Sequence, residues 1–216
     1  MGAPSKPKLP MNKLKSFSLT LACLAALSAQ SAEEEFHPLF NGKDLTGWKL
    51  RNPQGHQSWS VLPDGVLKNT VEKGTHGTDL VSEKKFWNFA VTYEFMTPDN
   101  SNSGFYLRGR HEIQILGDHA SGQLKKGGNG AIYNFKAPDK FVTKPAGEWQ
   151  KAEVTMIGHK ITVILNGVKI HENVECTEAT GGELDRNVNE PGPILLQGDH
   201  GTVSFRSIML KELPKE

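Results

Sequence analysis

Beyond residue 32 the chain alternates apolar and polar residues with a period of two over several short segments, and no segment shows a convincing helical period. Residues 89–96, FAVTYEFM, place three aromatic residues and a valine on one face, as a half-buried strand does. The stretch 153–172 alternates similarly and is interrupted by a Gly-His pair and by Asn166-Gly167. Because Asn-Gly between apolar runs favours a two-residue turn, this stretch predicts consecutive hairpins.

The remaining pattern also consists of short segments separated by turns. Five of these segments are expected to be strands: 59–67, 80–82, 131–133, 194–197 and 203–210. Many short strands with little helix indicate a β-sandwich or barrel rather than a parallel sheet with crossover helices. Two longer connections, 117–130 and 172–193, hold little that can form a core, and we expect them to border a functional site.

The N-terminal region has the layout of a secretory signal peptide. Residues 11–32 begin with two lysines, continue with an apolar run too short to span a bilayer, and end in small residues. We therefore expect residues 1–32 to be an upstream extension plus signal peptide, and 33–216 to be a single β-sandwich catalytic domain in the periplasm or outside the cell. A lipoprotein anchor at Cys23 is less favoured, because Thr20 stands where such a motif has leucine.

Charge and cysteine content narrow the choice of partners. Of 25 basic and 24 acidic residues, four lysines and no acid lie in 1–32, so the predicted mature domain has a net charge of about −3. This charge gives no electrostatic case for nucleic acid or anionic membrane. Cys176 is the one cysteine left, which excludes an intrachain disulfide. The eight histidines show no metal-ligand spacing, so neither a metal nor a cofactor is expected.

One segment, SGFYLRGRHEIQIL at 103–116, combines an apolar face with an unusual polar face. A three-residue loop at 109–111 would turn it into a hairpin with Arg108 opposite Glu112 and Tyr106 opposite Gln114. These planar polar groups and the aromatic ring suit a polyhydroxylated ligand. The alternative is a solvated sheet face stabilised by a cross-strand Arg/Glu pair.

Five segments carry a family resemblance across the mature chain: FHPLFNGKDLTGWKL at 36–50, NSGFYLRGRHEIQIL at 102–116, GAIYNF at 130–135, GEWQKAEVTMIGHKITVILNG at 147–167 and PGPILLQGDHGTVSFRSIMLKEL at 191–213. In order, they resemble the bacterial 3-keto-disaccharide hydrolases, also described as 3-keto-glucoside 1,2-lyase/3-keto-2-hydroxy-glucal hydratase domains. The resemblance implies an all-β, concanavalin A-like (lectin/glucanase-like) jelly-roll β-sandwich of two antiparallel sheets. It also implies export and action on an oligosaccharide or glycoside already oxidised at C3.

Such a reaction sets clear chemical requirements. A ketone at C3 acidifies the C2 hydrogen; loss of that proton expels the C1 substituent by elimination, and water can then add across the double bond. The enzyme needs a base near C2, donors at the C3 oxygen and an acid for the departing oxygen. Glu112 and His200 are the expected catalytic residues, either of them as the base. Arg108 and Gln114 are candidates to hold the oxyanion, and Tyr106 to stack or donate.

The full set of expected substrate-binding residues follows the same polar segments. It comprises Asn102, Tyr106, Arg108, Gln114, Tyr133, Lys144, Gln197 and Asp199. Asp199 precedes His200 in QGDHG, a turn that matches the family pattern, and Lys144 is expected as a contact at the rim.

Two other functions remain open from the sequence. An ordinary glycoside hydrolase needs two carboxyl groups about 5 to 10 Å apart, for which Glu94 is a candidate partner of Glu112. A non-catalytic carbohydrate-binding module would instead use its tryptophans as a stacking platform. These tryptophans are Trp48, Trp59, Trp87 and Trp149.

Overall fold

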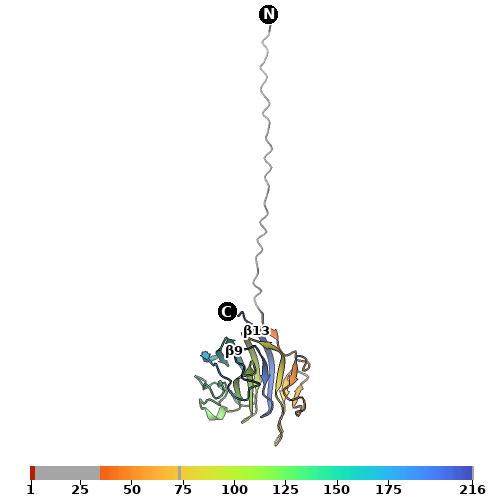
Figure 1. Cartoon of the computed structure of the whole chain (residues 1–216), viewed down its shortest axis with the longest axis vertical. Helices are drawn as coiled ribbons and strands as arrows, with labels where there is room; N and C mark the ends of the chain where they lie inside the picture. The colour runs from red at the N-terminus through yellow and green to blue at the C-terminus, as the bar shows by residue number, and fades with distance from the viewer. Residues whose placement is uncertain (3–34, 73, 216) are drawn as a thin grey trace. The chain divides into compact units, whose positions relative to one another are not determined.

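The computed structural model describes residues 1–2, 35–72 and 74–215 (Figure 1). The predicted signal peptide, including Cys23, lies outside these residues. The described residues from 35 to 215 form one compact unit built of two antiparallel sheets. A single 3₁₀ turn, η1 (His119–Ser121), is the one helical element within the described ranges, and none there is long and apolar enough to cross a membrane. The expected all-β sandwich is confirmed.

The larger sheet has eight strands in the described part of the chain. In spatial order they are β11 (Val168–Glu175), β10 (Lys160–Leu165), β9 (Gln150–Ile157), β6 (Phe89–Met96), β13 (Val203–Glu212), β4 (Leu67–Asn69) and β3 (Trp59–Val61), with β1 (His37–Pro38) also paired to β13. The hairpins predicted in 153–172 are confirmed, with turns at Gly158-His159 and Asn166-Gly167. The strand expected at 59–67 is instead two strands separated by a turn.

The smaller sheet carries the candidate site. Its order is β2 (Trp48–Leu50), β5 (Leu80–Phe86), β12 (Gly192–Leu196), β7 (Asn102–Leu107) and β8 (His111–Leu116). The strand expected at 131–133 is absent; these residues make only isolated bridges beside β8. Their backbone nevertheless covers the edge of β8, because the Tyr133 amide donates to the Glu112 carbonyl at 3.0 Å.

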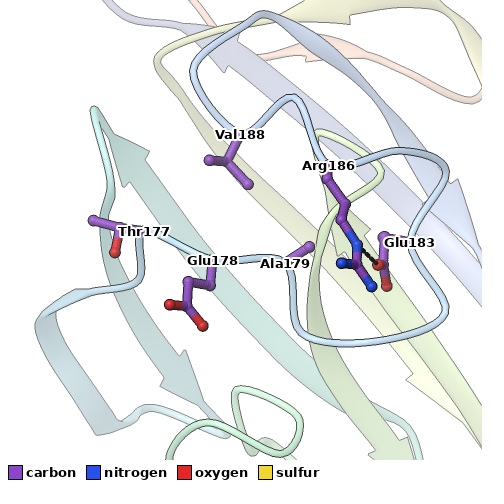
Figure 2. A pocket seen from close by; sticks show the side chains of 6 residues that line it. All are labelled: Thr177, Glu178, Ala179, Glu183, Arg186 and Val188. Carbon is purple, nitrogen blue, oxygen red and sulfur yellow. Dashed lines mark hydrogen bonds and ion pairs between the residues drawn. The ribbon is translucent and has the colours of Figure 1, made fainter.

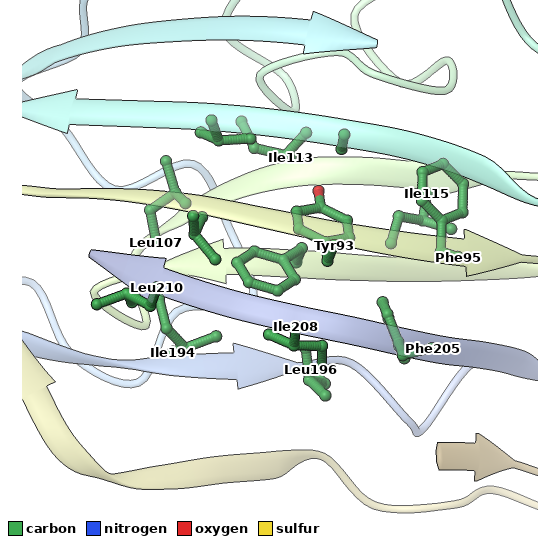
Figure 3. Close-up of a cluster of buried hydrophobic side chains, with 14 of the residues drawn as sticks. Tyr93, Phe95, Leu107, Ile113, Ile115, Ile194, Leu196, Phe205, Ile208 and Leu210 are labelled. Carbon is green, nitrogen blue, oxygen red and sulfur yellow. The ribbon is translucent and has the colours of Figure 1, made fainter. Parts of the chain in front are cut away.

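The core lies between the two sheets. The ring of Tyr93 on β6, which is labelled in Figure 3, stacks on Phe105 on β7 with centroids 4.0 Å apart, and this contact joins the sheets. Four apolar side chains of the β7–β8 hairpin are buried against this core, namely Phe105, Leu107, Ile113 and Ile115. The alternate side chains of the same two strands therefore point to the outer face of the smaller sheet.

The β7–β8 hairpin keeps the predicted faces but not the predicted register. Its three-residue loop is Arg108–Arg110 rather than 109–111, so Tyr106 pairs with Glu112. Each residue of β7 pairs with a residue of β8 two positions earlier than expected; Tyr106, for example, faces Glu112 instead of Gln114. Because side chains alternate with period two, a shift of two positions leaves every paired residue on its predicted face. Arg108 changes position with the register. It lies in the loop with φ 53° and is no longer on the polar face.

Candidate functional site

A cavity of about 120 Å³ opens at the outer face of the smaller sheet, over β7 and β8. Eight residues line it: Asn102, Tyr106, Glu112, Gln114, Tyr133, Gly182, Gln197 and His200. All of them except Gly182 are site residues expected from the sequence. The two hairpin strands supply four of them, and segments distant in sequence supply the rest, so the fold gathers the predicted residues around one hollow.

Glu112 lies at the floor of this cavity with 2 % of its surface exposed. The hydroxyl of Tyr106 donates to its Oε2 at 2.9 Å, and its peptide nitrogen donates to the Thr180 hydroxyl at 2.9 Å. Space for the carboxyl group comes from Gly104 on the neighbouring strand, where a Cβ atom would overlap Oε1. The carboxyl group of Glu112 therefore fits into the space that Gly104 leaves and is held there by the hydrogen bond from Tyr106.

Burial dominates the electrostatics of Glu112. The pKa of the carboxyl group is raised to about 8, chiefly by burial; the Tyr106 hydrogen bond lowers this pKa, and the negative charges of Asp79 and Asp199 raise it. Burial also raises the pKa of the Tyr106 hydroxyl, so that it stays protonated. At neutral pH most Glu112 side chains consequently carry a proton that they can give to a ligand.

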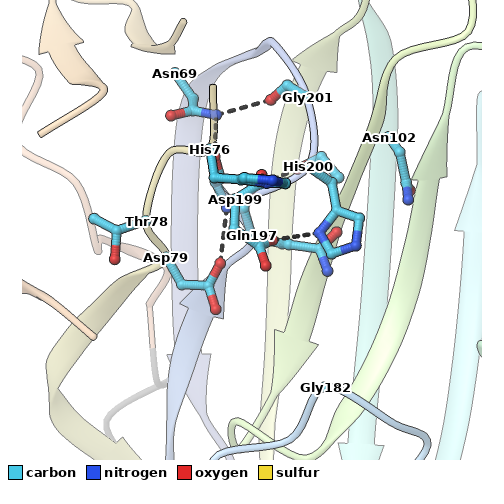
Figure 4. A network of polar contacts seen from close by, with 12 residues as sticks. Asn69, His76, Thr78, Asp79, Asn102, Gly182, Gln197, Asp199, His200 and Gly201 are labelled. Atoms are coloured by element: carbon cyan, nitrogen blue, oxygen red, sulfur yellow. Dashed lines mark hydrogen bonds and ion pairs between the residues drawn. The ribbon is translucent and has the colours of Figure 1, made fainter. Parts of the chain in front are cut away.

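His200 enters the cavity from the turn after β12. Its Nδ1 lies 2.5 Å from Oδ1 of Asp199, and 53 % of its side chain is exposed (Figure 4). When the proton of the neutral ring is on Nδ1, where it is donated to Asp199, Nε2 has a free lone pair and can accept a proton from a ligand. Asp199 does not line the cavity itself; it orients the imidazole that does.

The amide side chains that line the cavity differ in the hydrogen bonds that they make to the rest of the protein. Gln114 Nε2 donates to Asn102 Oδ1 at 3.1 Å and to the Gly127 carbonyl at 3.3 Å, which fixes both amides along the wall. Gln197 is buried, and its Oε1 has no hydrogen-bond partner in the described part of the chain. A buried amide without a partner is costly, so Gln197 is the amide best suited to bind a ligand.

Gly182 was missed in the sequence because glycine carries no side-chain chemistry. It belongs to the loop that follows β11 and adopts φ +67°, where a Cβ atom would lie 2.5 Å from the Tyr106 hydroxyl. Only a glycine lets the loop approach the Tyr106–Glu112 pair this closely. The one sequence signal is the Gly181-Gly182 pair within a long connection, as expected for a loop bordering a site.

Two predicted binding residues lie elsewhere. Arg108 is fully buried: its guanidinium stacks on Trp87 at 3.6 Å and donates to the carbonyls of Trp87 and Gly158, each at 2.8 Å. Lys144 is exposed, and its Nζ donates to the Trp149 carbonyl at 2.9 Å. Neither lines the cavity. The buried guanidinium of Arg108 cannot hold an oxyanion there, so that role was wrong, whereas the rim contact expected of Lys144 stays a prediction.

The cavity contains one carboxylate among its described lining residues, Glu112. The expected alternative partner, Glu94, lies on β6 in the larger sheet and pairs with Arg206 at 2.7 Å. Asp79 pairs with Arg51 at 3.1 Å. The arrangement of two carboxyl groups on either side of one glycosidic bond is therefore not built from the residues lining this cavity.

The tryptophans do not form a shared platform. Trp48 and Trp59 belong to the core, Trp87 covers Arg108, and Trp149 lies under the Arg206 guanidinium at 4.1 Å. Among the described residues, no three His, Cys, Asp or Glu side chains come close enough to hold a metal ion.

A second hollow lies on the loop that follows β11 (Figure 2). Its lining residues are Thr177, Glu178, Ala179, Glu183, Arg186 and Val188. Arg186 is 89 % exposed and pairs with Glu183 of the same loop at 3.3 Å. No buried polar group faces this hollow from its described lining, so the cavity over β7 and β8 is the candidate site.

Comparison with known families supports the carbohydrate-active function expected from the sequence. The family described as 3-keto-alpha-glucoside-1,2-lyase-like domain matches residues 35–211. No curated protein matches the chain. The family match spans both sheets and every residue that lines the cavity.

Solved structures of similar chains share the fold. A "putative glycosyl hydrolase" from Parabacteroides distasonis is 30 % identical with a TM-score of 0.67, over 82 % of this chain and 84 % of that one. Another chain of the same description and organism is 24 % identical with a TM-score of 0.70, over 84 % and 95 %. The carbohydrate-binding module CBM66 from Bacillus subtilis is 12 % identical with a TM-score of 0.51, over 78 % and 98 %, which shows a common fold alone.

Proposed function

Because the chain belongs to the carbohydrate-active family of 3-keto-alpha-glucoside-1,2-lyase-like domains, we propose that it cleaves glucosides already oxidised at C3. One observation carries this proposal: the same cavity holds a buried carboxylic acid, Glu112, and an imidazole, His200, with an available nitrogen. The pair supplies an acid and a base without a second carboxylate.

In the first step His200 Nε2 takes the proton from C2. The electron pair of the C2–H bond moves toward C3, and the C3 oxygen becomes an enolate oxygen. We assign Gln197 to this oxygen, because its side chain lines the cavity and an amide whose Oε1 has no protein partner can turn its nitrogen toward the ligand as a donor. Asp199 stabilises the imidazolium that forms.

In the second step the C1–O bond breaks. The enolate electrons form the C1–C2 double bond, and Glu112 gives its proton to the departing aglycone oxygen. Hydration reverses these transfers: the Glu112 carboxylate accepts a proton from water as the water oxygen bonds to C1, and the His200 imidazolium returns a proton to C2. The sum is hydrolysis of the glycosidic bond.

The electrostatic setting favours this division of roles. A carboxyl group whose pKa is raised to about 8 keeps its proton at neutral pH and acts as an acid. The imidazole is exposed and faces Asp199, so it can gain a proton while its partner compensates the charge. Glu112 as the initial base would first have to lose its own proton.

We also propose that residues 1–32 are removed on export, and that the remaining chain acts in the periplasm or outside the cell. The lysine-flanked apolar segment of residues 11–32 supports this. Mass spectrometry of the protein recovered from its native host tests it: a mature form that begins near residue 33 is expected, and a full-length chain in the cytoplasm contradicts it.

The substrate proposal is tested by offering the enzyme a glucoside and its 3-keto counterpart under the same conditions. Release of the aglycone from the oxidised compound alone is expected. Cleavage of the unoxidised glucoside would identify an ordinary glycosidase. Binding of either sugar without cleavage would identify a binding module, and both results reject the proposal.

A further inference from the structure

Arg51, which follows β2, connects the smaller sheet to the loop that borders the cavity. Its Nη1 donates to the Gly182 carbonyl at 2.9 Å, and its Nη2 donates to the Glu183 carbonyl at 2.9 Å. The same Nη1 lies 3.1 Å from Oδ2 of Asp79. A single guanidinium therefore binds two consecutive carbonyls of the loop and the carboxylate of Asp79, the residue directly before β5.

Asp79 continues this connection to the other side of the cavity (Figure 4). Its side chain is 7 % exposed, and its Oδ1 accepts a hydrogen bond from the Gly198 amide at 3.0 Å. Gly198 directly precedes the Asp199-His200 pair. The two oxygens of one buried carboxylate are thus divided between Arg51 and the backbone of the His200 turn.

We propose that Arg51 and Asp79 are positioning residues, which together set the loop at Gly182 and the turn at His200 relative to Glu112. We call the pair the Arg51–Asp79 clamp. The role of the clamp in turnover rests on the function proposed above; its role in holding the two segments does not.

The clamp has the features of a geometric device rather than a stabilising ion pair. The Arg51 side chain is 38 % exposed, and ion pairs with an exposed partner add little to the free energy of unfolding. Its planar fork instead binds acceptors in fixed directions, which lysine cannot reproduce. Asp79 adds a second effect, because its charge raises the pKa of Glu112. The clamp thus bears on both catalytic groups without contacting the cavity.

The structural role is tested by amide hydrogen exchange measured by mass spectrometry on the full chain. Arg51→Ala should raise exchange in two segments at once, around residues 180–184 and around 198–201. Arg206→Ala is the matched control, because Arg206 makes a comparable guanidinium–carboxylate pair with Glu94 on the larger sheet. Faster exchange in one segment alone, or in neither, overturns the clamp. If Arg51→Ala does not fold, Arg51→Lys is measured in its place with the same criteria.

The catalytic consequence is tested with the 3-keto-glucoside. Misplacing a reacting group by about 1 Å can lower the rate about 100-fold, so Arg51→Ala and Arg51→Lys should each lower kcat/KM by about that factor, with Arg206→Ala near wild type.

The charge of Asp79 is tested by Asp79→Asn. This variant keeps an acceptor for the Gly198 amide but removes the charge that raises the pKa of Glu112, so it should move the alkaline limb of the kcat/KM profile to lower pH. The catalytic role of the clamp is overturned if both Arg51 variants have wild-type kcat/KM, or if the alkaline limb of Asp79→Asn lies at the same pH as in wild type. If wild type does not turn over the 3-keto-glucoside, the proposed function fails, and the exchange experiment still decides the clamp.

Discussion

The Tyr106 hydroxyl lies 2.9 Å from Oε2 of Glu112, its direct partner across β7 and β8. This hydrogen bond is the one interaction that lowers the pKa of Glu112, against burial and two nearby carboxylates that raise it. Tyr106→Phe should therefore raise the pKa of Glu112 and move the alkaline limb of the kcat/KM profile to higher pH. A pH profile of the variant on the 3-keto-glucoside checks this, and a shift to lower pH contradicts it.

Gly104 makes room for the catalytic carboxyl group. In Gly104→Ala the new methyl group would overlap Oε1 of Glu112, so the carboxyl group must move and kcat/KM should fall about 100-fold or more. The midpoint of thermal unfolding should fall as well, since β7 and β8 are both buried here. Gly127→Ala is the control for stability, because its nearest neighbour, Tyr133, lies 3.8 Å from the added Cβ atom. Wild-type kcat/KM in Gly104→Ala would place the reaction away from Glu112.

Glu112 should also leave a signature in the pH dependence of stability. Its folded pKa of about 8 lies above its ordinary value of 4.5, so the folded state binds more protons between these values. The associated stability is complete below about pH 4.5 and is lost as the pH rises through 8, with each pKa unit worth about 1.4 kcal/mol. Denaturant unfolding at several pH values measures this loss.

Glu112→Gln provides the comparison for that experiment. The variant cannot ionise, so its free energy of unfolding relative to wild type should increase from pH 5 to pH 9, while its kcat/KM falls about 10²- to 10⁴-fold through loss of the acid. A constant difference in unfolding free energy across this range would mean that Glu112 titrates as an ordinary exposed carboxyl group.

Arg108 should matter for stability and not for the chemistry. Lysine cannot reproduce the stacking on Trp87 together with the two hydrogen bonds to backbone carbonyls, so Arg108→Lys should lower the free energy of unfolding by about 1 to 3 kcal/mol. The kcat/KM of the folded variant should stay near wild type. A large loss of kcat/KM in a variant with normal stability would restore the role in oxyanion binding predicted from the sequence.

The contrast between Arg108 and its neighbours shows what alternation can predict. Period-two patterning assigned Tyr106, Glu112 and Gln114 to one face, and any loop of odd length preserves that assignment. It does not fix which three residues form the loop. That choice depends on the left-handed conformations at Arg108 and Gly109, which carry the guanidinium into the interior.

Long-range contacts account for most of what the sequence could not supply. Gly182 borders the site through contacts between segments far apart in sequence; its carbonyl is bound by Arg51, 131 residues away. Asp79 reaches the His200 turn through a backbone amide, 119 residues away. Neither contact has a local pattern, and His200 itself was found mainly through the family resemblance.

The most direct test of the proposed mechanism is the isotopic composition of the sugar released from a 3-keto-glucoside in D₂O. The exposed imidazole of His200 exchanges its proton with solvent, so elimination followed by hydration should place one deuterium at C2 of each product molecule. The free 3-keto sugar, incubated with and without enzyme, measures exchange after release. Deuterium at C2 above that background is the predicted result, and release of the aglycone with protium retained at C2 contradicts the mechanism.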